Sequence, residues 1–187
     1  VGIVWYVSFA GSGTDSSNSN TVANRANPTL GPDSAPVVIT EYSDLTCPAC
    51  AAAAPTIEEI AAAYPDDVRI VFSGLNLQHR WSEKSHEAGE CALDQGKFWE
   101  YHDVLFQNQA NFTLARLITL AGVAKLDTTA FRNCMDSNKY EQQVKDDLIY
   151  AGNKNVTGTP SFMVNTQLVF RDTLKLTIDL ELANLGK

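Results

Sequence analysis

The sequence has no excess of basic residues: its 187 residues include 14 Lys and Arg against 22 Asp and Glu, for a net charge of −8. The electric field of such a molecule repels phosphate backbones and anionic lipid headgroups. We therefore expect no nucleic acid among its partners. The body of the chain also lacks the roughly 20 consecutive apolar residues of a membrane-spanning helix. One globular domain is expected at this length.

The first ten residues differ from the body of the chain, because VGIVWYVSFA is an uncharged apolar run, although too short to cross a membrane. Since the sequence starts with Val rather than Met, we interpret residues 1–10 as the remnant of a signal peptide or membrane anchor. Residues 11–20 are rich in Gly, Ser and Asn and resemble a tether. The alternative is a disordered or loosely packed strand. We expect anchor and linker over 1–30 and the domain over 31–187.

The domain is predicted to begin with a strand, a helix and a second strand. Residues 35–42 are apolar and β-branched, which favours a buried central strand, and 68–72 has the same character. Between them, residues 47–64 carry apolar side chains at helical spacing, with Pro55 expected to kink the helix. This order predicts parallel strands joined by a right-handed crossover.

No strand is predicted between residues 81 and 154. Helical patterns instead recur there, over 82–94, 98–108, 114–121, 128–135 and 139–151. Strand patterns return at 160–164 and 167–170 around a two-residue turn, which is typical of a hairpin, and an amphipathic helix follows over 172–185. The sequence thus predicts an α/β protein: a central mixed sheet flanked by helices, with an inserted all-helical subdomain.

Cysteine is scarce, and two of the four cysteines form the motif Cys47-Pro48-Ala49-Cys50 where a strand ends and a helix begins. That setting is typical of a redox-active pair. Free N–H groups and the helix dipole stabilise a thiolate at the first turn of a helix, so the pKa of Cys47 should fall below about 8.5. Cys47 is therefore the expected nucleophile. Cys50 is the expected resolving cysteine, which attacks a mixed disulfide on Cys47.

Two other interpretations of the motif are half of a zinc site and an inert structural disulfide. A zinc site needs a second cysteine pair or suitably spaced histidines, and the sequence has neither. The three histidines, His79, His86 and His102, are expected at the surface instead. A bridge across so short a loop would add little stability. We expect no metal and no cofactor besides the cysteine pair itself.

Four segments resemble the DsbA family of thiol-disulfide oxidoreductases in the thioredoxin superfamily. They are APV with EYSD at 35–44, CPAC at 47–50, QGKFWEYH at 95–102 and GTPSF at 158–162. The resemblance extends from about Gly31 to the C-terminus and implies a thioredoxin fold. It also implies a cis peptide bond before Pro160, facing the cysteine pair, and a Thr159 that offers backbone groups to an extended substrate segment. The alternative for Pro160 is an ordinary proline at the start of a strand.

Glu41 lies six residues before Cys47, the spacing at which family members place a buried acidic residue near the resolving cysteine. Burial would raise its pKa, and it could then carry a proton to or from Cys50. The alternative is a partly exposed carboxylate at a strand end, while Tyr42 and Asp44 are expected to be structural. The chain departs from the family where SGLN replaces a basic, proline-containing turn after the second strand, which puts a charged partner for Glu41 in doubt. It is also short after residue 170.

Resemblance and expected location together imply an extracytoplasmic dithiol oxidase, in the periplasm or on the outer face of the cell membrane. Its partners would be reduced cysteine-containing proteins as substrates. A membrane quinone-linked thiol oxidase, DsbB-like or vitamin K epoxide reductase-like, would reoxidise Cys47 and Cys50. We expect the chain to be membrane-anchored and to act as a monomer. A reductase of the same fold and a non-catalytic peptide-binding module or chaperone are the alternatives.

The two remaining cysteines, Cys91 and Cys134, fall on predicted helices of the insertion. An export context permits disulfides, and the cysteine count is even once the active-site pair is set aside. These observations favour a structural disulfide between them. The alternative is two buried free thiols that pack as small apolar side chains.

Overall fold

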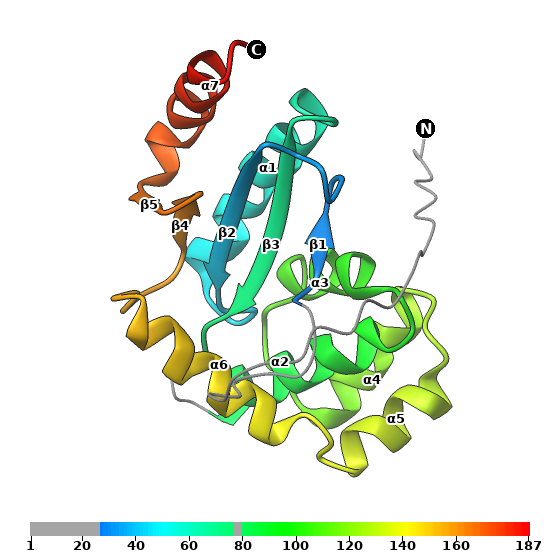
Figure 1. The fold of residues 1–187 in the computed structure, drawn as a ribbon. Coiled ribbons are helices and arrows are strands. Elements are labelled where there is room, and N and C mark those ends of the chain that lie inside the picture. Colours follow the sequence, from blue (N-terminus) through cyan, green and yellow to red (C-terminus); the bar gives the residue numbers. More distant parts are fainter. Residues whose placement is uncertain (1–26, 77–79) are drawn as a thin grey trace, which may run out of the picture.

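The computed structural model describes residues 27–76 and 80–187, so the proposed anchor and tether lie outside the described residues. Its centre is a five-stranded sheet in the order β1-β3-β2-β4-β5 (Figure 1). The strands are β1 (Thr29–Leu30), β2 (Val37–Ser43), β3 (Val68–Gly74), β4 (Ser161–Val164) and β5 (Gln167–Val169). β2 and β3 are parallel, as predicted, and the other pairs are antiparallel. The α/β fold with a mixed sheet is thus confirmed, and the two-residue β1 is an addition that the sequence pattern did not predict.

The helices follow the predicted order closely. They are α1 (Pro48–Ala63), α2 (Arg80–Leu93), α3 (Phe98–Phe106), α4 (Leu114–Val123), α5 (Thr128–Asp136), α6 (Glu141–Asn153) and α7 (Leu174–Asn184), with a short 3-10 helix, η1 (Arg171–Thr173), before α7. α1 connects β2 to β3 and continues through Pro55, whose side chain is exposed. None of the helices within the described ranges is long and apolar enough to cross a membrane.

Two of the three hydrophobic clusters within the described residues meet at the end of the sheet. One core lies between the sheet and helices α1 and α7, and it buries Ile39, Ile70 and Ile178. The other fills the interior of the helical insertion, which lies beyond the ends of β2 and β3 in Figure 1. Cys50 belongs to this second core, and Trp99 of α3 packs against both. The motif at the start of α1 therefore lies at the junction of the two cores.

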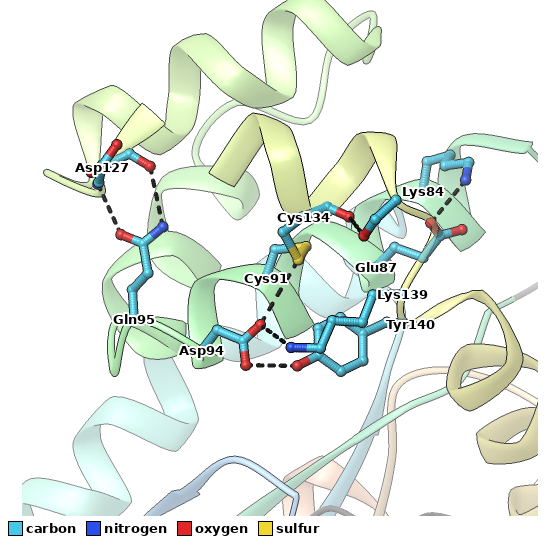
Figure 2. The surroundings of a disulfide bond; sticks show 10 residues. Lys84, Glu87, Cys91, Asp94, Gln95, Asp127, Cys134, Lys139 and Tyr140 are labelled. Atoms are coloured by element: carbon cyan, nitrogen blue, oxygen red, sulfur yellow. Dashed lines mark hydrogen bonds and ion pairs between the residues drawn. A yellow bond between two sulfur atoms is a disulfide. The ribbon is translucent and has the colours of Figure 1, made fainter. Parts of the chain in front are cut away.

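A disulfide joins Cys91 of α2 to Cys134 of α5, with the two Cα atoms 5.9 Å apart. Figure 2 shows the polar side chains around it. Asp94 accepts a hydrogen bond from the Tyr140 hydroxyl at 2.6 Å and forms an ion pair with Lys139 at 2.9 Å. The bridge and these contacts tie α2 to the segment that runs from α5 into α6.

The expected surface location of the histidines is wrong for His86 and His102, which are 6% and 4% exposed. His79 lies outside the described residues. His102 is buried because helical spacing places it on the same stripe of α3 as Phe98 and Phe106, which face the core of the insertion. Both imidazoles lie next to buried carboxyl groups, His86 near Asp44 and His102 near Glu41.

Candidate active site

Cys47 is the N-cap residue of α1 and is partly exposed. Its backbone is extended, and Pro48 occupies the first helical position, where a missing N–H costs nothing. The thiol of Cys47 donates to the carbonyl oxygen of Thr159, with 3.8 Å between the sulfur and the oxygen. The sulfur therefore lies at the positive end of a helix, accessible from solvent and beside the loop that precedes β4.

Cys50 is a free thiol like Cys47 but is completely buried. Its sulfur accepts a hydrogen bond from the backbone N–H of Asp44 at 3.4 Å. Burial raises the pKa of the Cys50 thiol to about 12, although Ser43, Thr159 and the Asp44 N–H oppose this in part. Cys50 therefore holds its proton at neutral pH. It can act as a nucleophile only if a neighbouring group removes that proton.

The peptide bond between Thr159 and Pro160 is cis and lies directly before β4. β4 pairs with β2 so that Ser161 is opposite Tyr42, which brings the loop to the end of β2 from which the cysteine motif continues. The Ser161 hydroxyl donates to the Gly158 carbonyl at 2.7 Å and holds the loop. The loop thus packs against the cysteine pair, as the resemblance implies.

Glu41 lies inside the protein, 1% exposed, on the face of β2 that contacts the helices. Burial raises the pKa of its carboxyl, while the neighbouring His102 and Ser43 lower it in part. Within the described ranges neither carboxylate oxygen has a hydrogen-bond partner. The geometry therefore matches the buried acid and not the partly exposed strand-end carboxylate. The SGLN turn put a charged partner for Glu41 in doubt, and the structure places His102 next to Glu41 instead.

We predict that the reduced Glu41→Gln variant becomes more stable relative to the reduced wild type as the pH rises. The pKa of Glu41 is raised in the folded state, so above its unfolded value of 4.5 the folded state keeps a proton that the unfolded chain has lost. Stability therefore falls with rising pH in the wild type, by at most about 1.4 kcal/mol per pH unit for one proton, until the folded-state pKa is passed. Urea unfolding of both proteins from pH 4 to pH 9 measures the difference. A difference that does not change with pH would contradict the buried titration.

Asp44 fixes the loop that leads into the motif. Its buried carboxylate accepts hydrogen bonds from the Ser82 hydroxyl at 2.6 Å and from the N–H and hydroxyl of Thr46, both at 2.7 Å. Burial alone would raise the pKa of Asp44, but His86 and these hydrogen bonds lower it overall. Burial lowers the pKa of His86 to about 4, so at neutral pH this imidazole is uncharged. The hydrogen bonds of Ser82 and Thr46 therefore hold Asp44 in its charged form.

Gln109 is a site residue that sequence reasoning missed. Its side-chain amide donates to the carbonyl oxygen of Cys47 at 2.8 Å and to that of Leu45 at 3.3 Å. It also borders a cavity of about 430 Å³ beside the motif. The cavity is lined by Thr46, Trp81, Gln109, Asn111, Phe112 and Thr113. No sequence pattern marks Gln109, because it lies in a loop 62 positions after Cys47 and only the packing of the insertion brings it to the motif.

Comparisons with known proteins agree with the fold and the cysteine motif described above. The model of the thioredoxin family matches residues 23–178, which is most of the chain. The chain belongs to the thioredoxin family. Probable disulfide bond formation protein D of Bacillus anthracis is 31% identical to this thioredoxin-family chain over 167 residues, covering 82% of the chain and 77% of that protein.

Solved structures of related proteins have the same fold. The crystal structure of oxidised BdbD from Bacillus subtilis matches with a TM-score of 0.77 and 26% identity, over 84% of this chain and 93% of BdbD. The resemblance to DsbA-type thiol-disulfide oxidoreductases is therefore confirmed. Among residues 27–76 and 80–187, no three His, Cys, Asp or Glu side chains are grouped as a metal ion requires.

Some relatives of this thioredoxin-family chain are much longer proteins. Na(+)/H(+) antiporter NhaA 3 of Salinispora tropica is 36% identical over 137 residues, which is 72% of the chain and 21% of the antiporter. The chain thus spans about a fifth of the length of the antiporters that it matches.

Proposed function

We propose that this thioredoxin-family chain is a thiol-disulfide oxidoreductase that introduces disulfides into exported proteins. One observation carries the proposal: partly exposed Cys47 at a helix N-terminus is paired with fully buried Cys50 one turn along the helix. Disulfide exchange needs one accessible sulfur that meets the partner and one protected sulfur that ends the encounter.

In the oxidising direction, a substrate thiolate attacks Cys47 of the Cys47–Cys50 disulfide. A bond forms between the substrate sulfur and the sulfur of Cys47. The Cys47–Cys50 bond breaks, and Cys50 leaves with the electron pair of that bond. Because burial raises the pKa of Cys50 to about 12, the leaving sulfur takes up a proton, which the buried Glu41 carboxyl supplies. A second substrate thiolate then attacks the substrate sulfur of the mixed disulfide and releases Cys47. The substrate has lost two electrons, and the cysteine pair holds them.

Substrates of this reaction are reduced, cysteine-containing protein segments in an extended conformation. Such a segment would lie along Thr159 and Pro160, where the Thr159 carbonyl oxygen already accepts a hydrogen bond from the Cys47 thiol. The cavity beside Thr46 is large enough to take a substrate side chain. Likeness to disulfide bond formation protein D supports this substrate class.

Continued turnover requires an oxidant for the reduced cysteine pair. We assign this role to a membrane quinone-linked thiol oxidase, DsbB-like or vitamin K epoxide reductase-like, and we place the domain outside the cytoplasm as a monomer. Within this chain we assign electron transfer to the cysteine pair alone. The expected anchor of residues 1–10 would keep the domain near such a membrane partner.

We predict that the reduction potential of the Cys47–Cys50 pair lies nearer to the DsbA value of about −120 mV than to the thioredoxin value of about −270 mV. Equilibration with glutathione, followed by alkylation and mass spectrometry, measures it. Oxidative refolding of a reduced protein should be accelerated, with the Cys47→Ser variant as the inactive control. A potential near that of thioredoxin, with strong insulin reduction, would make the chain a reductase. Peptide binding without turnover would make it a binding module.

A further inference from the structure

Several buried polar side chains of β2, α3 and the loop before β4 have atoms without hydrogen-bond partners. In the described parts of the chain they include both Glu41 carboxylate oxygens, the Ser43 and Thr159 hydroxyls and Nε2 of His102. Most folds contain few such atoms, because an unsatisfied buried polar group is costly. Ser43 and Thr159 act on the Cys50 thiol, while Ser43 and His102 act on the Glu41 carboxyl, so these side chains form one connected group.

His102 reaches from this interior to the surface. Nδ1 of its ring contacts the Asp103 carboxylate at 2.8 Å, and the Asp103 side chain is 44% exposed. A carboxylate only accepts hydrogen bonds, so this contact places a hydrogen on Nδ1, and in the neutral ring the buried Nε2 then carries a free lone pair. One nitrogen is thus linked to solvent through Asp103, and the other is available inside the protein.

The surroundings of His102 hold its ring in one place. Phe106, Trp99, Phe72 and Phe98 surround it, with ring centroids 4.5, 5.2, 5.5 and 5.8 Å away. This apolar enclosure offers Nε2 no competing partner from the rings around it. A purely structural imidazole in such a site would be expected to pair both nitrogens.

Glu41 lies next to this enclosure. It is opposite Phe72 in the register of β2 and β3, so the two side chains leave the same face of the sheet, and the Phe72 ring contacts His102. When both ring nitrogens carry a hydrogen, His102 also lowers the pKa of the Glu41 carboxyl. Ser43 follows on the same face of β2, two residues on, and interacts with the thiol of Cys50.

Two other titratable groups at this junction are His86 and Asp44. His86 of α2 packs 6.1 Å from the Phe72 ring and is buried, and Asp44 is held by its hydrogen bonds ahead of α1. The titratable side chain that acts on the Glu41 carboxyl is His102, whose ring also contacts the exposed Asp103 carboxylate.

We propose that His102 and Asp103 form the solvent end of a proton path that serves Cys50 through Glu41. The proposal rests on the proposed function of the cysteine pair. When the disulfide closes, Cys50 gives its proton to the Glu41 carboxylate, a proton passes from the Glu41 carboxyl to the lone pair on Nε2 of His102, and Nδ1 releases its proton to water at Asp103. When the disulfide opens, each proton moves in the opposite direction, so that Nε2 gives up its proton and Nδ1 regains one. His102 acts through Glu41 and is a positioning residue, because it does not touch the reacting sulfurs.

The decisive variant is His102→Phe, which keeps a ring among the four aromatic side chains and removes both nitrogens. The probe is a synthetic peptide with two reduced cysteines, mixed with the oxidised protein in single turnover, acid-quenched, alkylated and analysed by mass spectrometry. We expect the rate at pH 7 to fall about tenfold, below the 10²–10⁴-fold range for direct acid–base groups. The ratio of wild-type to variant rates should also change between pH 5 and pH 8. A merely structural role would give a ratio that does not change with pH.

Two further variants complete the test. Asp103→Asn should lower the rate in the same direction but less, and it supplies the answer if His102→Phe does not fold. Glu100→Gln removes the same charge from an exposed position of α3 and should leave both the rate and its pH dependence unchanged. If the wild type reacts with the peptide while His102→Phe and Asp103→Asn keep its rate and pH profile, the path is wrong and the proposed function stands. If the wild type itself does not react, the proposed function fails.

Discussion

Replacing Cys50 with Ala should turn the protein from a catalyst into a covalent trap. Cys47 remains partly exposed at the start of α1 and can still attack a substrate disulfide, but no buried thiol is left to release the product. An external thiol at millimolar concentration must then replace an intramolecular one, whose effective molarity can reach about 10⁵ M or more. We expect turnover in insulin reduction and in oxidative refolding to fall by about 10³-fold or more. Mixed disulfides should accumulate at the same time.

Non-reducing electrophoresis with mass spectrometry of the adducts tests this trap. Every adduct should be attached to Cys47, and Cys47→Ala should form none, because Cys50 is completely buried and its raised pKa keeps it protonated. Adducts on Cys50 in the Cys47→Ala variant would reverse the assigned roles. Undiminished turnover of Cys50→Ala would show that the pair does not act as nucleophile and resolving thiol.

Local sequence patterns were sufficient to predict the elements that position the cysteine pair. β-branched runs gave β2 and β3, helical spacing gave α1, and the strand, helix, strand order fixed their parallel pairing. These features depend on neighbours in the sequence. The two-residue β1 has no such pattern, and it is a strand only because Thr29 and Leu30 meet β3.

The surroundings of the cysteine pair depend on contacts between distant segments, and the sequence predicted less of them. Glu41 could be chosen from its spacing and from family resemblance, but its neighbour His102 comes from an insertion helix. A signal for His102 was present, since it falls on the apolar stripe of α3 with Phe98 and Phe106. The polarity of a histidine favours the surface, but its position on the helix outweighs that preference here. For Gln109 there was no signal, because loop packing alone decides its contact with Cys47.

The bridge between Cys91 and Cys134 should contribute more to stability than any surface contact in the insertion. It closes a loop with a sequence separation of 43 residues, for which the chain-entropy model gives about 4 kcal/mol at 25 °C. That is a large part of the 5–15 kcal/mol that typically stabilises a domain. We therefore predict that Cys91→Ala/Cys134→Ala lowers the free energy of unfolding by about 4 kcal/mol. Residual structure in the unfolded chain would make this loss smaller. Urea unfolding at pH 7 measures it, with Cys47→Ser/Cys50→Ser as the common background.

A matched control separates the bridge from its polar surroundings. Lys139→Gln removes the ion pair with Asp94 shown in Figure 2, in which the Lys139 side chain is 55% exposed. Exposed ion pairs contribute at most about 1 kcal/mol, so this variant should remain close to the parent protein. Thiol counting on the denatured, unreduced Cys47→Ser/Cys50→Ser protein provides the chemical check. No free thiols would support the bridge. Two free thiols would disprove it, and the two side chains would then stabilise the insertion only through packing, which the Ala variants would reduce without any change in loop entropy.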